Sequence, residues 1–118
     1  MTNSTGALHE GLHRESQDNR TDNLDKLNGL FSDVEAFYTH ALQLKSRLEE
    51  RDYVALLNTF ISAGERKHRE AVQAIHAILA VKPVAGDIVR TANDVERRVC
   101  AKVAHLYLLR KEITGKII

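Results

Sequence analysis

An apolar pattern with the period of an α-helix is the feature of this 118-residue chain that most constrains its fold. No glycine or proline lies between Leu30 and Ala63. Apolar side chains there recur every three or four residues, which places them on one face of a helix. The first stripe consists of Leu27, Leu30, Phe31, Val34, Phe37, Tyr38, Ala41, Leu44 and Leu48. Because no alternating strand pattern is present, we expect an all-α protein.

A second stripe follows on the same uninterrupted stretch but out of phase with the first. It consists of Leu57, Ile61, Gly64, His68, Val72, Ile75 and Leu79. On one straight helix the second stripe would lie about 160° from the first, so one face could not bury both. We therefore predict a break between Glu49 and Asp52, with Asp52 as the cap of the new helix. The result is an antiparallel hairpin with helices at about 23–49 and 52–81.

A third helix is predicted at about 87–114. Pro83 closes the second helix, because proline cannot donate a backbone hydrogen bond and disfavours helical geometry in the preceding residue. Gly86 and Asp87 supply a turn and a cap, and Gly115 is a natural stop. The inward stripe consists of Ile88, Ala92, Val95, Val99, Val103, Leu106 and Ile113. Residues 23–118 thus form a helical bundle domain, in which a second copy or a partner helix can complete a four-helix arrangement.

Residues 1–22 have a different composition, rich in polar side chains with few apolar ones. Such a segment cannot bury enough surface to order itself, so we expect a flexible, disordered N-terminal tail. The tail contains His9-Glu10-Gly11-Leu12-His13, which matches the zinc-protease pattern of two histidines one helical turn apart with a glutamate between them. That chemistry also needs a third ligand and an edge strand, which we do not find here. Incidental metal binding and no role at all both stay open for this motif.

Charge and cysteine content exclude several classes of function. The 17 basic and 16 acidic side chains nearly cancel, and no basic cluster stands out, so nucleic acid is not expected as a partner. Cys100 is the only cysteine, so an internal disulfide is impossible and we expect a cytoplasmic protein. We expect its thiol to be buried or half-buried. No stretch approaches the roughly 20 apolar residues of a membrane span.

The second stripe contains the one place where the expected core could carry chemistry. Glu65 and His68 lie three residues apart, so both can hold one cation from the same side of a helix. Further carboxylates are available on the other two helices, from Glu35 at the border of its stripe and from Glu96 closer to the buried face. These four residues form a candidate metal site for iron, or for manganese or zinc.

A resemblance to a known family rests on these residues. Phe60, Ala63, Glu65, His68 and the following Ala71-Val72 resemble the second helix of ferritin-like and rubrerythrin-like proteins, and Glu35-Ala36 with Tyr38 resembles their first-helix glutamate. The resemblance covers about residues 24–81. It implies a four-helix bundle that binds two metals for iron oxidation, oxygen reduction or iron storage. That family carries two Glu-x-x-His motifs and this chain has one, so a full site would need two copies. We therefore expect self-association.

Two alternatives stay open. His68 can instead be a structural histidine that bonds a partner inside the bundle, with Glu65 solvated beside it. The segment Leu42 to Leu57, with its acidic turn, resembles the helical hairpin of small flagellar or type III export chaperones, which bind amphipathic helices of other proteins. An interaction protein of that kind would show a long exposed apolar strip on the third helix.

Overall fold

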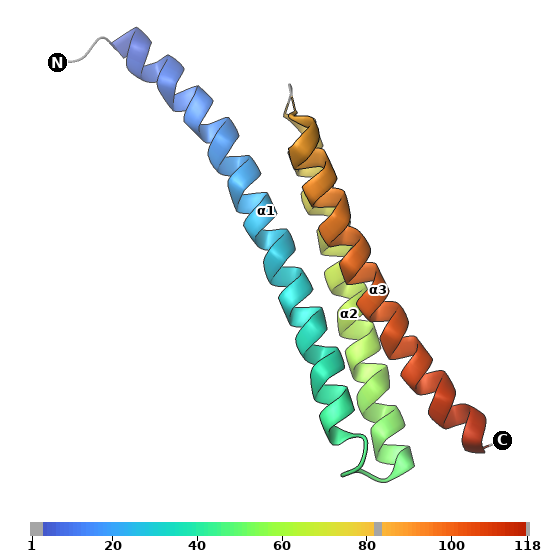
Figure 1. The fold of residues 1–118 in the computed structure, drawn as a ribbon. Helices are drawn as coiled ribbons and strands as arrows, with labels where there is room; N and C mark the ends of the chain where they lie inside the picture. Colours follow the sequence, from blue (N-terminus) through green and yellow to red (C-terminus); the bar gives the residue numbers. More distant parts are fainter. Residues whose placement is uncertain (1–3, 82–83, 118) are drawn as a thin grey trace.

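The computed structural model is a bundle of three long helices. It describes the backbone of residues 4–81 and 84–117 and the side chains of residues 21–81 and 84–115. The helices are α1 (Ser4–Leu44), α2 (Glu50–Ala80) and α3 (Gly86–Ile117), and the described residues contain no strand. α1 and α2 form an antiparallel hairpin, and α3 packs along both (Figure 1). The predicted all-α, three-helix architecture is confirmed. No helix in the described ranges is long and apolar enough to cross a membrane.

The break between the first two helices lies at residues 45–49, after α1 ends at Leu44 and a few residues before the predicted Glu49 to Asp52, and Asp52 is not the cap. Leu48, which was predicted in the first stripe, lies in this break and is 37% exposed. α2 begins at Glu50, and Glu49 is the N-cap, with an extended backbone at φ −65° and ψ 151°. The Tyr53 amide donates to the Glu49 carbonyl at 2.9 Å and closes the first helical turn. Asp52 therefore lies inside the first turn, where its negative charge interacts favourably with the positive end of the helix dipole.

The N-terminal start of α1 differs from the predicted bound. α1 begins at Ser4 rather than near residue 23, and its first part extends away from the other two helices (Figure 1). Side chains before Thr21 lie outside the described residues. The predicted mobility of residues 1–22 and any role of the motif from His9 to His13 therefore stay predictions.

The ends of α2 and α3 lie close to their predicted bounds. α2 ends at Ala80, and Val81 is extended. Pro83, the predicted stop, lies outside the described residues. α3 continues through Gly115 to Ile117. Gly115 does not end the helix because its backbone is not in the left-handed conformation that terminates helices.

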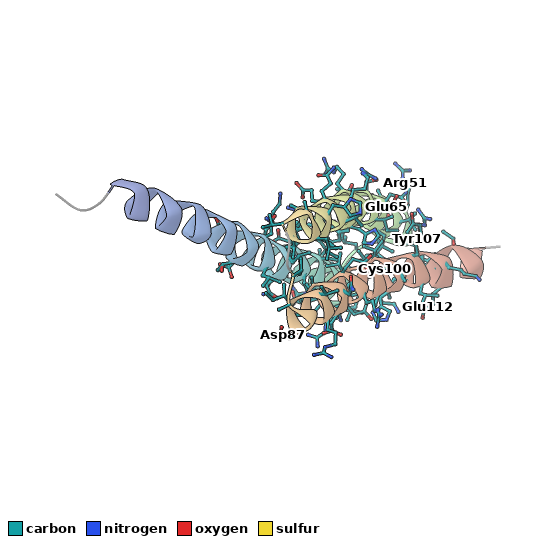
Figure 2. All side chains as sticks on the ribbon, turned by 90° about the horizontal axis from the view of Figure 1, so that it is seen from above. Arg51, Glu65, Asp87, Cys100, Tyr107 and Glu112 are labelled. Atoms are coloured by element: carbon teal, nitrogen blue, oxygen red, sulfur yellow. The ribbon has the colours of Figure 1, made fainter. Side chains whose placement is uncertain are left out.

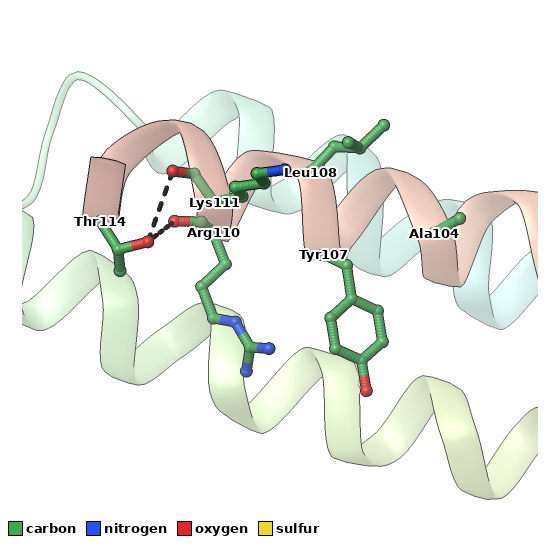
Figure 3. Close-up of a pocket in the computed structure, with 6 residues that line it drawn as sticks. All are labelled: Ala104, Tyr107, Leu108, Arg110, Lys111 and Thr114. Carbon is green, nitrogen blue, oxygen red and sulfur yellow. Dashed lines mark hydrogen bonds between the residues drawn. The ribbon is translucent and has the colours of Figure 1, made fainter. Parts of the chain in front are cut away.

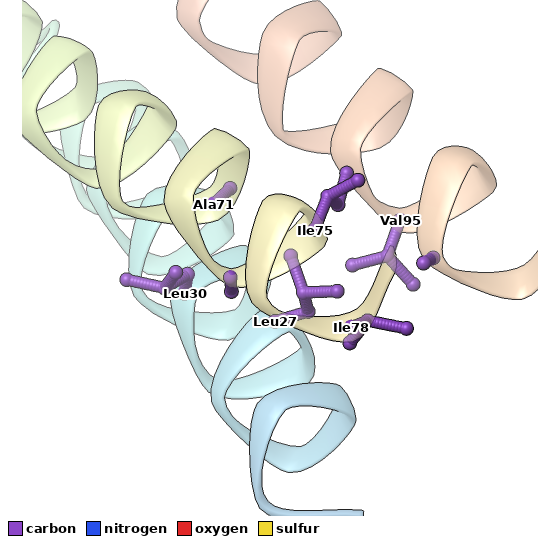
Figure 4. Packing of buried hydrophobic residues seen from close by; sticks show 8 residues of the cluster. Leu27, Leu30, Ala71, Ile75, Ile78 and Val95 are labelled. Atoms are coloured by element: carbon purple, nitrogen blue, oxygen red, sulfur yellow. The ribbon is translucent and has the colours of Figure 1, made fainter. Parts of the chain in front are cut away.

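The core runs along the bundle as three apolar clusters. The cluster towards the end of α2 contains Leu27, Leu30, Ala71, Ala74, Ile75, Ile78, Ala92 and Val95 (Figure 4). The middle cluster contains Val34, Val99 and Val103. The third contains Ala41, Tyr53, Leu57, Ile61, Leu106, Leu109 and Ile113. Burying each large aliphatic side chain contributes roughly 1.5–3 kcal/mol, so this continuous core is the main stabilising feature of the bundle.

Gly64 lets α2 and α3 approach each other closely. It is buried in the middle of α2, and a Cβ placed there would lie 3.1 Å from a methyl carbon of Val103. A methyl carbon of Leu106 would lie 3.8 Å from this added Cβ. An added Cβ would require the Val103 side chain to shift by a few tenths of an ångström, so Gly64 favours the close spacing of the two helices that carry the candidate site.

Candidate functional site

Three polar contacts connect α2 to α3 along one side of their interface. Arg110 donates a hydrogen bond to the side-chain oxygen of Asn58 at 2.9 Å. The Tyr107 hydroxyl donates to a carboxylate oxygen of Glu65. His68 Nε2 lies 2.6 Å from Glu96 Oε1. The helices are antiparallel, so residues that are early in α2 meet residues that are late in α3.

His68 lies at the edge of the buried face of α2 rather than at its centre. The buried residues include Ala71, Ala74 and Ile78, which are not in the predicted stripe, and they shift the centre of the face away from His68. The His68 side chain is 32% exposed and that of Glu96 is 26% exposed. A half-buried imidazole in contact with a carboxylate has a partner for its polar nitrogen, as the structural alternative requires.

Glu65 is bound to Tyr107 rather than to His68. The hydrogen bond from the phenol to this carboxylate raises the pKa of Tyr107, and desolvation and the negative charge of Glu65 act in the same direction. The guanidinium of Arg110 lies 4.8 Å from the centre of the Tyr107 ring and opposes this shift. Tyr107 is thereby fixed against α2 by a hydrogen bond on one side and a cation–π contact on the other.

The four residues of the candidate metal site are not brought together as a set. His68 and Glu96 are in contact, whereas Glu65 bonds Tyr107 and Glu35 is exposed on α1. Within the residues whose side chains are described, no three His, Cys, Asp or Glu side chains are close enough to hold a metal ion. The pair of His68 and Glu96 supplies two ligands at most, fewer than a protein metal site normally uses.

A groove of about 280 Å³ lies between α2 and α3, beside these contacts. Its lining comprises Glu65, His68, Arg69, Cys100, Val103, Ala104 and Tyr107. Glu65, Cys100 and Tyr107 lie near one another in the view along the bundle (Figure 2). The thiol of Cys100 is exposed, so the prediction of a buried or half-buried cysteine is wrong. Position 100 follows the buried Val99, and the next residue on a helix points about 100° away from the core.

α3 carries a second apolar surface on the side opposite its core residues. We call this surface the outer face of α3. It consists of Cys100, Ala101, Ala104 and Leu108, and Tyr107 lies at its border towards α2. All five residues are exposed, and Leu108 is 60% accessible to solvent. In Figure 3, Ala104 and Leu108 point away from α2, while Tyr107 points towards it. The helix therefore has apolar side chains on two faces, of which only one is covered by the bundle.

A second hollow lies on this face, next to the groove. It has a volume of about 640 Å³ and is lined by Ala104, Tyr107, Leu108, Arg110, Lys111 and Thr114. Ala104 and Tyr107 line both hollows, so the two are neighbours. The sequence analysis expected an exposed apolar strip on the third helix only for an interaction protein, and it did not identify the residues because the inward stripe of α3 already explained why a helix forms. The signal was present as apolar residues at positions 100, 101, 104 and 108, which fall on one side of a helix.

Comparison with models of protein families, with curated protein sequences and with solved structures finds no match for this chain. The ferritin-like resemblance and the export-chaperone resemblance therefore both stay hypotheses.

Proposed function

We propose that this protein is a small helical interaction protein that binds an amphipathic helix of a protein partner on the outer face of α3. The proposal rests on the exposure of Leu108 beside a hollow whose lining includes the small residue Ala104. A partner helix could place one apolar side chain in that hollow and cover Leu108 with others. This is the helix-in-groove mode of recognition, in which side chains at helical spacing act as anchors.

The shape of the surface supports a helix as the ligand. Small side chains at Cys100, Ala101 and Ala104 allow another backbone to approach closely, while Leu108 projects as a knob. Tyr107 borders the face and is held by Glu65 and Arg110. A side chain that is already fixed loses little conformational entropy on binding, so Tyr107 is suited to be an anchor at the border of the interface.

A metal-dependent, ferritin-like function has less support from the described geometry. It would require at least one ligand in addition to His68 and Glu96, supplied from outside the described side chains or by a second copy. Elemental analysis after anaerobic loading with Fe(II) separates the two functions. One or more iron atoms per chain in the wild type, lost in His68→Ala, would favour the metal function. A protein peak without iron would favour the interaction function.

A synthetic peptide tests the interaction function directly. The probe is a fluorescent amphipathic helix of about 20 residues with a Leu and Ala stripe and Gln on its polar side, and the readout is fluorescence anisotropy. We expect the wild-type protein and Leu42→Asp to bind it and Leu108→Asp to bind at least tenfold more weakly. Leu42 is a matched control because it is also an exposed leucine, 45% accessible, but lies on α1. Equal anisotropy curves for all three proteins would contradict the proposed function.

The setting that we propose for this function is the cytoplasm. An exposed lone thiol at the binding surface persists unmodified in a reducing compartment.

A further inference from the structure

Basic side chains surround the outer face of α3 on several sides. Arg110 and Lys111 line the hollow beside Leu108. Arg69 lines the groove between α2 and α3, and Arg66 lines the adjoining surface together with Arg69 and Glu65. Arg97 is exposed one helical turn before Cys100 on α3. These five residues, Arg66, Arg69, Arg97, Arg110 and Lys111, form what we call the basic border.

Most of the charges in the basic border are not neutralised within the chain. The side chains of Arg66, Arg69, Arg97 and Lys111 make no hydrogen bond or ion pair among the residues whose side chains are described. The fifth, Arg110, bonds the neutral Asn58 side chain and so keeps its charge uncompensated. A patch of uncompensated cations beside an apolar surface produces a positive potential that favours an anionic partner.

Three acidic side chains near the basic border are engaged by groups outside it. Glu65 accepts a hydrogen bond from Tyr107, and Glu96 contacts His68. Glu112 pairs with Lys45 of α1 at 3.3 Å. Among the described side chains, none of these three carboxylates forms an ion pair with a member of the basic border. The near-neutral total charge of the chain conceals this local separation of charge.

We infer that the partner helix is acidic, with Asp or Glu along the borders of its apolar stripe. This inference rests on the proposed function and specifies the chemistry of the partner. Arg97 and Lys111 lie at the two ends of the outer face, and the helical rise places them about 21 Å apart. A partner helix of about four turns spans that distance, with carboxylates near both of its ends and along the side that faces Arg69. A second copy of α3 fits this face less well, because two basic borders would oppose each other.

Three peptides with the same Leu and Ala stripe test the inference. Their polar positions carry Glu, Gln or Lys, and anisotropy is measured at low and at physiological salt. We expect the Glu peptide to bind at least tenfold more tightly than the Lys peptide at low salt. The difference should shrink as salt increases, because exposed charges are screened over about 8 Å at physiological ionic strength.

Charge reversal provides the second arm of the test. The double variant Arg69→Glu, Lys111→Glu should bind the Glu peptide at least tenfold more weakly than the wild type does and should bind the Lys peptide more tightly. The matched control is the double variant Arg47→Glu, Arg51→Glu, which reverses the charge of two exposed arginines outside the basic border. It should bind the three peptides in the same order of affinity as the wild type. Circular dichroism of each variant checks that the bundle is intact.

The outcomes separate this inference from the function on which it rests. If the three peptides bind equally and Leu108→Asp abolishes binding, the interaction function stands and the acidic partner is wrong. If no peptide binds the wild-type protein, both fail. Light scattering adds a further arm, because a dimer that Leu108→Asp dissociates would identify a second copy as the occupant and overturn the acidic-partner inference.

Discussion

The buried hydroxyl of Tyr53 donates a hydrogen bond to the backbone carbonyl oxygen of Ala41 at 2.7 Å, and so joins the start of α2 to the last turn of α1. Carbonyl groups in the last turn of a helix lack a full set of backbone donors, and a side-chain donor from a neighbouring helix can satisfy one of them. The Tyr53 ring is 1% exposed and packs in the cluster with Leu57 and Ile113. One residue thus fixes the hairpin turn through both its ring and its hydroxyl.

Removing this hydroxyl should destabilise the protein without opening the core. We expect Tyr53→Phe to lower the free energy of unfolding by about 1 kcal/mol, since the ring remains and one buried hydrogen bond is lost. Urea unfolding monitored by circular dichroism measures the change. Thr59→Val is the matched control, because its hydroxyl also bonds a backbone carbonyl but is exposed. If Tyr53→Phe lowers the free energy of unfolding no more than Thr59→Val does, the interhelical hydrogen bond contributes little to stability.

The same hydroxyl should make stability depend on alkaline pH. Burial, followed by the nearby charges of Glu112 and Tyr38, raises the pKa of Tyr53 above its ordinary value of 10.0. The folded protein then holds this proton more tightly than the unfolded chain, so the stabilisation is complete below about pH 10 and declines above it. The difference in unfolding free energy between wild type and Tyr53→Phe should be constant below about pH 10 and shrink as the pH rises above it. A difference that stays constant above that pH would contradict the burial of this hydroxyl.

Two glycines in helix interiors should respond differently to alanine. Nothing lies within 4 Å of a Cβ placed at Gly29, so Gly29→Ala should stabilise the protein by up to about 1 kcal/mol through helix propensity alone. At Gly64 the same gain is opposed by crowding against Val103. We expect Gly64→Ala to be less favourable than Gly29→Ala by about 1 kcal/mol or more. Thermal unfolding of both variants tests this, and an equal gain at both sites would mean that α2 and α3 are not tightly packed.

The sequence predicted the helices well because their signals are local. Apolar periodicity and the phase shift are each contained within a few consecutive residues, and the buried residues Leu27, Leu57 and Leu106 all belong to predicted stripes. The predicted turn and cap at Gly86 and Asp87 are wrong, because both residues lie inside α3 and the carbonyl of Ala85 accepts hydrogen bonds from the first free amides of the helix. The cap at Asp52 was wrong because the backbone of Glu49 decides where α2 begins. Such a choice depends on the tertiary path of the turn and has no clear signal in the residue types.

The candidate site was less predictable because it depends on contacts between helices. Spacing alone indicated that Glu65 and His68 share one side of a helix, and it could not show that Tyr107 and Glu96 would each engage one of them. His68 and Glu96 were both predicted as metal ligands. They are in contact, but as a pair and not as part of a larger cluster. An exposed apolar strip on α3 was expected for an interaction protein, but its residues were not identified, because an apolar residue on a helix is normally assigned to the core until the packing shows which side is covered.

The pair of His68 and Glu96 should contribute to stability as a unit. We expect His68→Ala and Glu96→Gln each to destabilise the protein, and the double variant to lose about 1 kcal/mol less than the sum of the two. Chemical unfolding of the four proteins provides the coupling energy. Arg98 and Asp94, an exposed pair at 2.9 Å on α3, supply a control cycle with an expected coupling of about 0.5 kcal/mol or less. Strict additivity for His68 and Glu96 would mean that their contact does not persist in solution.

A partner helix on the outer face of α3 would cover the native thiol of Cys100, which therefore reports on that face most directly. The measurement is the rate at which Cys100 reacts with a chromogenic aromatic disulfide, with and without a saturating amount of the Glu-flanked peptide. Bound helix should slow the reaction at least tenfold, because Cys100 lines the groove. A thiol placed on α1 by Ala36→Cys in a Cys100→Ser background should react at the same rate in both conditions, since Ala36 is exposed outside this face. An unchanged rate at Cys100 with saturating peptide would contradict the account.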